Sequence, residues 1–195
     1  MKNVFLFHGY IGKKMSDWLL WLEKELKKNK VDVYFPEYNN SQKPVMADWL
    51  KEFEITSSEI NFDTIFIAHS LGCLVALLLL QQSNIKISKV ILTACLKNEV
   101  SSQNLKGLWA KISEEEKESI ASFIEQELDW QKIKDSADDF VFYFSKDDYA
   151  VDFEENFEFY KKLFPDAKFK IYDNHGHFNH KNDIYEMPDI LSEII

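Results

Sequence analysis

Arginine is absent from this chain of 195 residues, so all 23 basic residues are lysines. Recognition of phosphate or carboxylate groups by a fork-shaped guanidinium is therefore unavailable. This absence disfavours a phosphorylated substrate, although lysine could bind one. The formal net charge of −10 also argues against a nucleic-acid partner, because contacts with a phosphate backbone need clustered cations.

Cysteine and long apolar runs are also scarce. The two cysteines, Cys73 and Cys95, lie inside apolar stretches, which is typical of buried free thiols in a reducing compartment. The apolar run near the start ends too early for a secretory signal. The longest run, residues 73–80, is far shorter than the roughly 20 residues that span a bilayer. We therefore expect a soluble cytoplasmic protein with no membrane partner.

The residues that are present predict a compact α/β fold. A hydrophobic fraction of 46% and 16 phenylalanines indicate a sizeable core, and the length favours one domain over residues 1–195. Strand-like and helix-like stretches alternate, which implies a doubly wound, mostly parallel sheet with helices on both faces. The expected strands are 3–8, 31–35, 62–68, 88–95, 140–144 and 167–172.

Helical spacing of apolar residues predicts the segments between the strands. Ser16 could cap a first helix, Pro44 suits the first turn of a second, and residues 73–80 form a buried third. Another helix carries Phe153, and the last begins at 184 or 188 and reaches 195.

The alternation pauses between residues 97 and 138, where no strand is evident. Ser113 and Glu116 fit a capping box that opens an amphipathic helix. We expect a short helical insertion here, either a small lid or a surface addition.

The most informative motif is Ala68-His69-Ser70-Leu71-Gly72, where a strand should end and a helix begin. Such a sharp turn exposes the serine, and the helix N-terminus favours a developing oxyanion. The pattern is close to the G-x-S-x-G nucleophile elbow, with Ala68 in place of the first glycine. The backbone N–H groups of Leu71 and Tyr10 are the expected oxyanion donors. A serine that only caps the helix is the simpler alternative.

Polar residues also follow other predicted strands. His8-Gly9-Tyr10 follows the first, residues 145–148 the fifth, and residues 173–178 the sixth. The carboxyl ends of parallel strands share one edge of a sheet, so a serine, an acid and a histidine could meet there. A histidine base can take the serine proton, and a carboxylate can fix the tautomer of that histidine.

Several stretches together carry a family resemblance. They are His8-Gly9-Tyr10, Trp18, Trp21-Leu22, Asp48-Trp49-Leu50, residues 68–73, Ser145-Lys146-Asp147-Asp148 and Gly176-His177-Phe178. With these stretches in this order, the chain resembles the small α/β-hydrolase group that includes retinoblastoma-binding protein 9 and the YdeN-like proteins. The resemblance implies a minimal α/β-hydrolase fold with six strands in the order 2-1-3-4-5-6.

The same resemblance implies Ser70 as nucleophile, Asp148 as acid and His177 as base. Tyr149 stands where proline is common in the family. Asp147 therefore remains an alternative to Asp148 as the acid.

Other polar and aromatic residues carry competing interpretations. His175, His177 and His180, with Asp173, could bind zinc, but no second ligand cluster accompanies them, so we expect no metal and no cofactor. We expect His8 to shape the oxyanion turn and His69 to be packed or to face solvent. The candidate substrate-binding residues near the mouth are Tyr10, Trp109, Trp130 and Phe178.

The sequence therefore predicts a metal-independent serine hydrolase, similar to carboxylesterases. It would cleave a small ester, thioester or amide through an acyl-enzyme. The alternative is an interaction protein with little turnover on the same scaffold, for which a protein partner is possible.

Overall fold

The computed structural model describes residues 2–10, 17–38, 43–54, 56–98 and 112–195. Its centre is a six-stranded sheet in the order β2-β1-β3-β4-β5-β6, with every pair parallel. The strands are β1 (Asn3–Phe7), β2 (Asp32–Tyr34), β3 (Ile65–His69), β4 (Ile87–Thr93), β5 (Ala137–Ser145) and β6 (Lys168–Tyr172). The predicted doubly wound order is confirmed.

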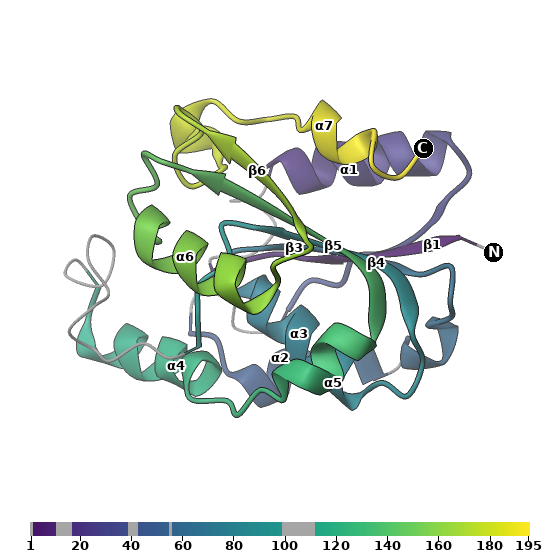
Figure 1. Ribbon diagram of the computed structural model, residues 1–195, viewed down its shortest axis with the longest axis horizontal. Helices are drawn as coiled ribbons and strands as arrows, with labels where there is room; N and C mark the ends of the chain where they lie inside the picture. Colours follow the sequence, from purple (N-terminus) through teal and green to yellow (C-terminus); the bar gives the residue numbers. More distant parts are fainter. Residues whose placement is uncertain (1, 11–16, 39–42, 55, 99–111) are drawn as a thin grey trace.

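Helices cover both faces of the sheet (Figure 1). One face carries α1 (Asp17–Lys28) and α7 (Pro188–Leu191). The other carries α2 (Met46–Glu54), α3 (Gly72–Gln82), α4 (Glu114–Ile124), α5 (Trp130–Asp135) and α6 (Phe153–Leu163). The carboxyl ends of the strands meet on the left of this view, beside the loop that follows β6.

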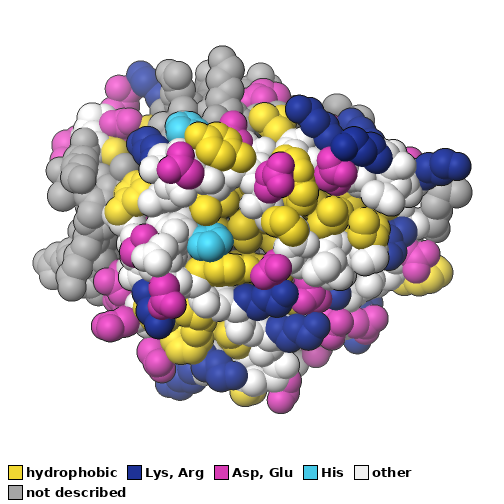
Figure 2. Space-filling view, turned by 90° about the horizontal axis from the view of Figure 1, so that it is seen from above, with side chains coloured by type: hydrophobic (Ala, Val, Ile, Leu, Met, Phe, Trp, Pro, Cys, Tyr) yellow, Lys and Arg dark blue, Asp and Glu magenta, His cyan; other side chains and the backbone are white. Residues whose placement is uncertain are grey.

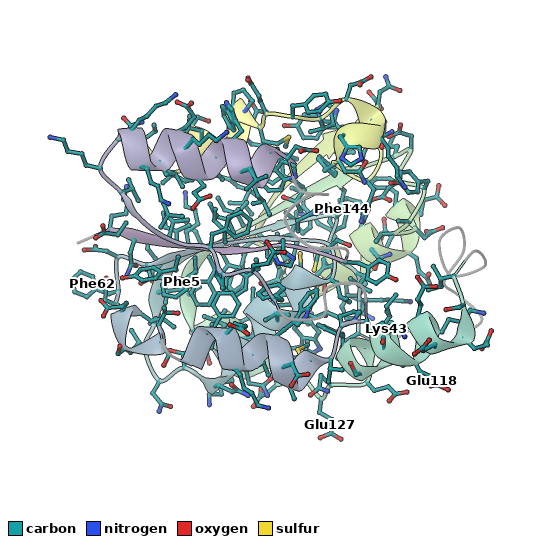
Figure 3. The ribbon with its side chains drawn as sticks, turned by 180° about the vertical axis from the view of Figure 1, so that it is seen from behind. Phe5, Lys43, Phe62, Glu118, Glu127 and Phe144 are labelled. Atoms are coloured by element: carbon teal, nitrogen blue, oxygen red, sulfur yellow. The ribbon has the colours of Figure 1, made fainter. Side chains whose placement is uncertain are left out.

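Two hydrophobic cores follow from the alternation of side chains along each strand. In β3, Ile65 and Ile67 pack toward α1, whereas Phe66 and Ala68 pack toward α3. Phe5 and Phe144 belong to the core on the α3 side and point into the interior in Figure 3. β3 is buried on both faces, and Ser70 follows directly after its last residue, His69.

Most predicted elements lie close to the observed ones, and the capping box of Ser113 and Glu116 is confirmed. The predicted start of β3 is wrong. Phe62 is 74% exposed and lies at the outer edge of the molecule in Figure 3. Asn61 accepts a hydrogen bond from the amide of Asp63 at 2.8 Å, and this turn delays the strand until Ile65.

Three other boundaries also differ. α2 begins at Met46, two residues after Pro44. β5 begins at Ala137, because the exposed Asp139 still pairs with Lys89 of β4. The last helix has only four residues and ends at Leu191. The predicted cap Ser16, Trp109 and part of the 97–138 segment lie outside the described residues.

The short last helix leaves apolar surface over this side of the sheet. Figure 2 shows hydrophobic side chains gathered on the face that carries α1 and α7. Tyr185, in the loop before α7, is 51% exposed. Ile171 of β6 is 41% exposed, but it alternates with Tyr172 and so lies on the opposite face of the sheet. Among the described residues, no helix is both long and apolar enough to cross a membrane.

Candidate active site

Ser70 lies on a tight turn between β3 and α3. Its φ of 53° is in the left-handed region, which side-chain-bearing residues rarely adopt. The turn is fixed by hydrogen bonds from the Ser70 amide to the carbonyl of Thr93 and from the Cys73 amide to the carbonyl of Ser70, both 2.9 Å. This backbone turns the serine side chain out of the strand and toward the loop that follows β6.

Small residues allow the chain to approach this turn closely. A Cβ atom on Gly72 would lie 2.4 Å from the carbonyl oxygen of His8 and 2.6 Å from that of Phe7. A Cβ atom on Gly9 would lie 2.9 Å from that of Ser70. The His8-Gly9 turn after β1 therefore packs directly against the serine, and Ala68 fits in the buried strand before it.

His177 faces Ser70 across the edge of the sheet. Its Nε2 atom lies 2.8 Å from Oγ of Ser70. Its Nδ1 atom lies 2.9 Å from Oδ2 and 3.0 Å from Oδ1 of Asp148. Since a carboxylate only accepts hydrogen bonds, Nδ1 carries the proton and Nε2 is left to accept from the serine hydroxyl. The side chain of His177 is 10% exposed and that of Asp148 is 4% exposed.

The two neighbouring aspartates make different contacts. Oδ1 of Asp148 also accepts hydrogen bonds from the amides of Ala150 and Val151, which hold the carboxylate toward His177. Asp147 instead accepts from the hydroxyl of Ser145 and from the amide of Gly176. Burial alone would raise the pKa of Asp147, but these two hydrogen bonds lower it below its usual value. The structure thus brings Asp148, and not Asp147, against the histidine.

His8 and His69 are both buried beside the serine. His8 donates from Nδ1 to the carbonyl of Gly9 and accepts at Nε2 from the amide of Tyr38. It thereby braces the turn next to Ser70, as expected. His69 is 3% exposed and contacts the carbonyl of His177, so it does not face solvent.

Tyr10 follows the same turn, and its hydroxyl donates to Glu116 on α4 at 2.5 Å. Burial, reinforced by this carboxylate, raises the pKa of Tyr10. The contact joins the turn beside Ser70 to the first turn of α4. Leu71, the other predicted oxyanion donor, is the residue just before α3.

Two predicted substrate-binding aromatics are placed elsewhere, which corrects the expectation. Phe178 is fully buried in the core under α1 and α7, so it cannot line an open mouth. Trp130 begins α5, before β5, and packs edge-on against Phe159, Tyr160 and Phe164. Helical spacing shows that an aromatic is buried on one side, but it does not show which end of the sheet it joins.

Tyr149 is an aromatic that the sequence reasoning did not select. It is 38% exposed, and its ring lies 5.9 Å from that of His177. Its hydroxyl accepts a hydrogen bond from Asn179 at 2.8 Å. The sequence signal that points to Tyr149 is its position directly after Asp148.

The three C-terminal histidines point to different partners. His177 faces Asp148, His180 pairs with Asp17 at 2.9 Å, and His175 stacks on Tyr172 with ring centroids 4.0 Å apart. Within the described ranges, no three His, Cys, Asp or Glu side chains gather as metal ligands would.

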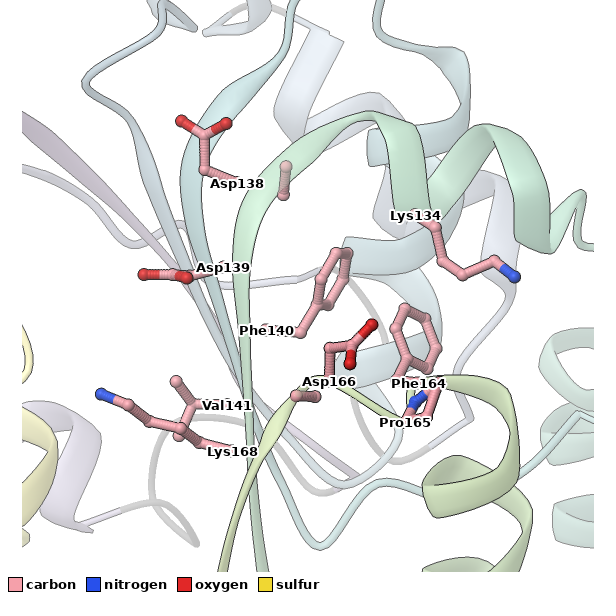
Figure 4. A pocket seen from close by; sticks show the side chains of 11 residues that line it. Lys134, Asp138, Asp139, Phe140, Val141, Phe164, Pro165, Asp166 and Lys168 are labelled. Carbon is pink, nitrogen blue, oxygen red and sulfur yellow. The ribbon is translucent and has the colours of Figure 1, made fainter.

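A cavity of about 310 Å³ lies at the opposite end of β5 (Figure 4). Its charged residues include Lys134, Asp138, Asp166 and Lys168. Asp138 is paired with Lys86 at 2.8 Å, and Lys168 with Glu193 at 3.2 Å. The lining of this cavity includes no residue of the Ser70 site.

Comparison with known proteins agrees with this fold. The chain is 24% identical over 196 residues to the hydrolase YdeN of Bacillus subtilis (strain 168), covering 98% of this chain and 95% of YdeN. The crystal structure of YdeN matches with a TM-score of 0.82, covering 100% of this chain and 97% of that one.

More distant structures share the fold. Carboxylesterase CesB of Bacillus subtilis is 14% identical with a TM-score of 0.59, covering 98% of this chain and 81% of that one. The esterase PF2001 of Pyrococcus furiosus is 16% identical with a TM-score of 0.66, covering 99% and 79%. The family model described as serine hydrolase matches residues 4–194. The chain therefore belongs to the serine hydrolase family.

Proposed function

We propose that this hydrolase cleaves a small ester, thioester or amide through an acyl-enzyme formed on Ser70. The observation that carries the proposal is the continuous contact from Oγ of Ser70 through the ring of His177 to Asp148. A serine hydroxyl is a weak nucleophile until a base removes its proton during attack. The ring of His177 contacts both the hydroxyl of Ser70 and the carboxylate of Asp148.

The proposed reaction has two halves. Oγ of Ser70 attacks the carbonyl carbon while its proton moves to Nε2 of His177, and a tetrahedral oxyanion forms. This intermediate collapses as His177 gives the proton to the leaving group, which departs. Water then attacks the acyl-enzyme with the same help and releases the acid. Asp148 keeps the proton on Nδ1 and stabilises the imidazolium.

The backbone N–H groups of Leu71 and Tyr10 are the proposed oxyanion donors. The position of Leu71 before α3 and the close packing of Gly9 on Ser70 support this assignment. We propose esters over amides because an alcohol is the easier group to expel. The fold neighbours CesB and PF2001 are named for ester cleavage.

No step of this mechanism needs a metal or a cofactor, and we propose that the enzyme works without either. The free thiols of Cys73 and Cys95 support our proposal of a reducing, cytoplasmic setting.

The test is hydrolysis of p-nitrophenyl esters of increasing acyl length, with thioesters and amides alongside. We expect turnover by the wild type and a loss of at least about a thousand-fold in kcat for Ser70→Ala and His177→Ala. Dialysis against EDTA should leave the wild-type rate unchanged. Equal rates for wild type and Ser70→Ala, with both chains folded by circular dichroism, would contradict the proposal. A folded wild type that turns over none of these substrates would favour the interaction protein.

A further inference from the structure

His69 is placed to act on the neighbouring histidine of the site. It is the last residue of β3, directly before Ser70. By alternation along the strand its side chain lies on the same face as Ile65 and Ile67. There it meets the edge of Trp18 of α1, with ring centroids 6.0 Å apart. The residue is 3% exposed, so solvent does not compete for its contacts.

The ring contacts the backbone of His177. Nε2 of His69 lies 2.9 Å from the carbonyl oxygen of His177, and the two rings are 5.0 Å apart. A carbonyl oxygen only accepts, so Nε2 of His69 carries a proton and donates it. Burial, aided by the nearby His177, lowers the pKa of His69 to about 3. The ring is therefore a neutral donor throughout the neutral pH range.

Other contacts hold the residues on either side of His177. Oγ of Ser145 accepts from the amide of His175, and Asp147 accepts from the amide of Gly176. Asn179 donates to Tyr149. The contact from His69 reaches the backbone carbonyl of His177 itself, and it comes from the last residue of the strand that leads into Ser70.

We propose that His69 is a positioning residue, which fixes the backbone of His177 relative to the strand that leads into Ser70. This inference rests on the proposed function, because it assigns His177 as the base. Catalytic groups must be held within about 0.5 Å of the productive geometry. Without the donor, the peptide at residue 177 can rotate, and the distance from Nε2 to Oγ of Ser70 is no longer held.

The test compares two variants of nearly equal shape, His69→Gln and His69→Met. The glutamine amide reaches about as far as Nε2 and can donate, whereas the methionine thioether cannot. We expect His69→Met to lose about 10- to 100-fold in kcat for a p-nitrophenyl ester, with KM changed less than about threefold. His69→Gln should keep kcat within about fivefold of the wild type.

Stability is measured alongside, because a residue that only fills space would affect folding in both variants alike. If His69→Met does not fold, His69→Phe, which fills the same space with a ring, takes its place. Full kcat in the folded variant without a donor, or equal losses in the glutamine and methionine variants, would overturn the inference alone. A wild-type chain that turns over no ester would remove the proposed function, and this inference with it.

Discussion

At the residue scale, two adjacent carboxylates serve different parts of the site. Asp148 contacts the ring of His177, and Asp147 holds the loop through Ser145 and Gly176. Their difference comes from the turn after β5, in which the amides of Ala150 and Val151 orient only Asp148.

Amide substitution should separate these two roles. Asp148→Asn removes the carboxylate that fixes the tautomer of His177, and we expect kcat to fall by about a thousand- to ten-thousand-fold. Asp147→Asn keeps an oxygen that can accept from Ser145 and Gly176, so its loss should stay below about tenfold. Steady-state kinetics on one ester measures both. Losses of equal size would show that the carboxylate at 148 has no special role.

At the element scale, the turn between β3 and α3 stores backbone strain. Ser70 has a φ of 53°, and Gly72 brings α3 against the backbone of β1. Placing a residue with a side chain in the left-handed region costs roughly 1–2 kcal/mol of conformational free energy, whereas glycine adopts this region freely.

Substitutions at residue 70 should therefore trade activity for stability. Both Ser70→Ala and Ser70→Gly remove the hydroxyl, but only glycine relieves the strain. After allowing for the greater freedom of glycine in the unfolded chain, we expect Ser70→Gly to be about 0.5–1 kcal/mol more stable than Ser70→Ala. Urea denaturation of the two inactive variants measures the difference. A less stable glycine variant would show that this φ carries no strain.

The elements themselves could be predicted where sequence pattern and environment agree. The buried runs that became β1 and β3, and the capping box of α4, were identifiable because apolar periodicity and end signals are local. The start of β5 was not, since Asp138 and Asp139 are exposed strand residues that look like a turn. The early end of α7 was missed because buried Ile194 continues the apolar pattern after the helix has ended.

The site was predictable to the same degree. Ser70, Asp148 and His177 lie at strand ends, and a parallel sheet gathers such ends at one edge. The choice between Asp147 and Asp148 depended on side-chain direction in a turn, which sequence order does not specify. The placement of Phe178 and Trp130 depended on tertiary packing, and so did the contact from His69.

At the scale of the whole molecule, the C-terminal turn is tied to the sheet by charge. Glu193, just after α7, contacts Lys89 of β4 and Lys168 of β6 at 3.2 Å, and Lys170 at 3.4 Å. Burial would raise the pKa of Glu193, but the hydrogen bonds from Lys89 and Lys168 lower it below 4.5. The carboxylate form therefore stabilises the fold.

This linkage predicts a pH-dependent effect of Glu193→Gln. Because the pKa of the Glu193 carboxyl is lower in the folded protein than in the unfolded chain, its charged form stabilises the fold. This stabilisation is fully present above the unfolded pKa of 4.5 and is lost as the pH falls through the folded pKa. We expect the variant to be about 1–2 kcal/mol less stable at pH 7, with a smaller gap near pH 3.5. Urea denaturation at the two pH values tests this. A gap of constant size would mean that packing, not charge, explains the loss.

The central claim is that the hydroxyl of Ser70 is made nucleophilic by His177. A fluorophosphonate probe followed by intact mass and peptide mapping tests it most directly. We predict one phosphonate per chain, on the peptide that contains Ser70, and no adduct on Ser70→Ala or His177→Ala under the same conditions. A folded wild-type chain that stays unlabelled, or one labelled at a different residue, would contradict the account.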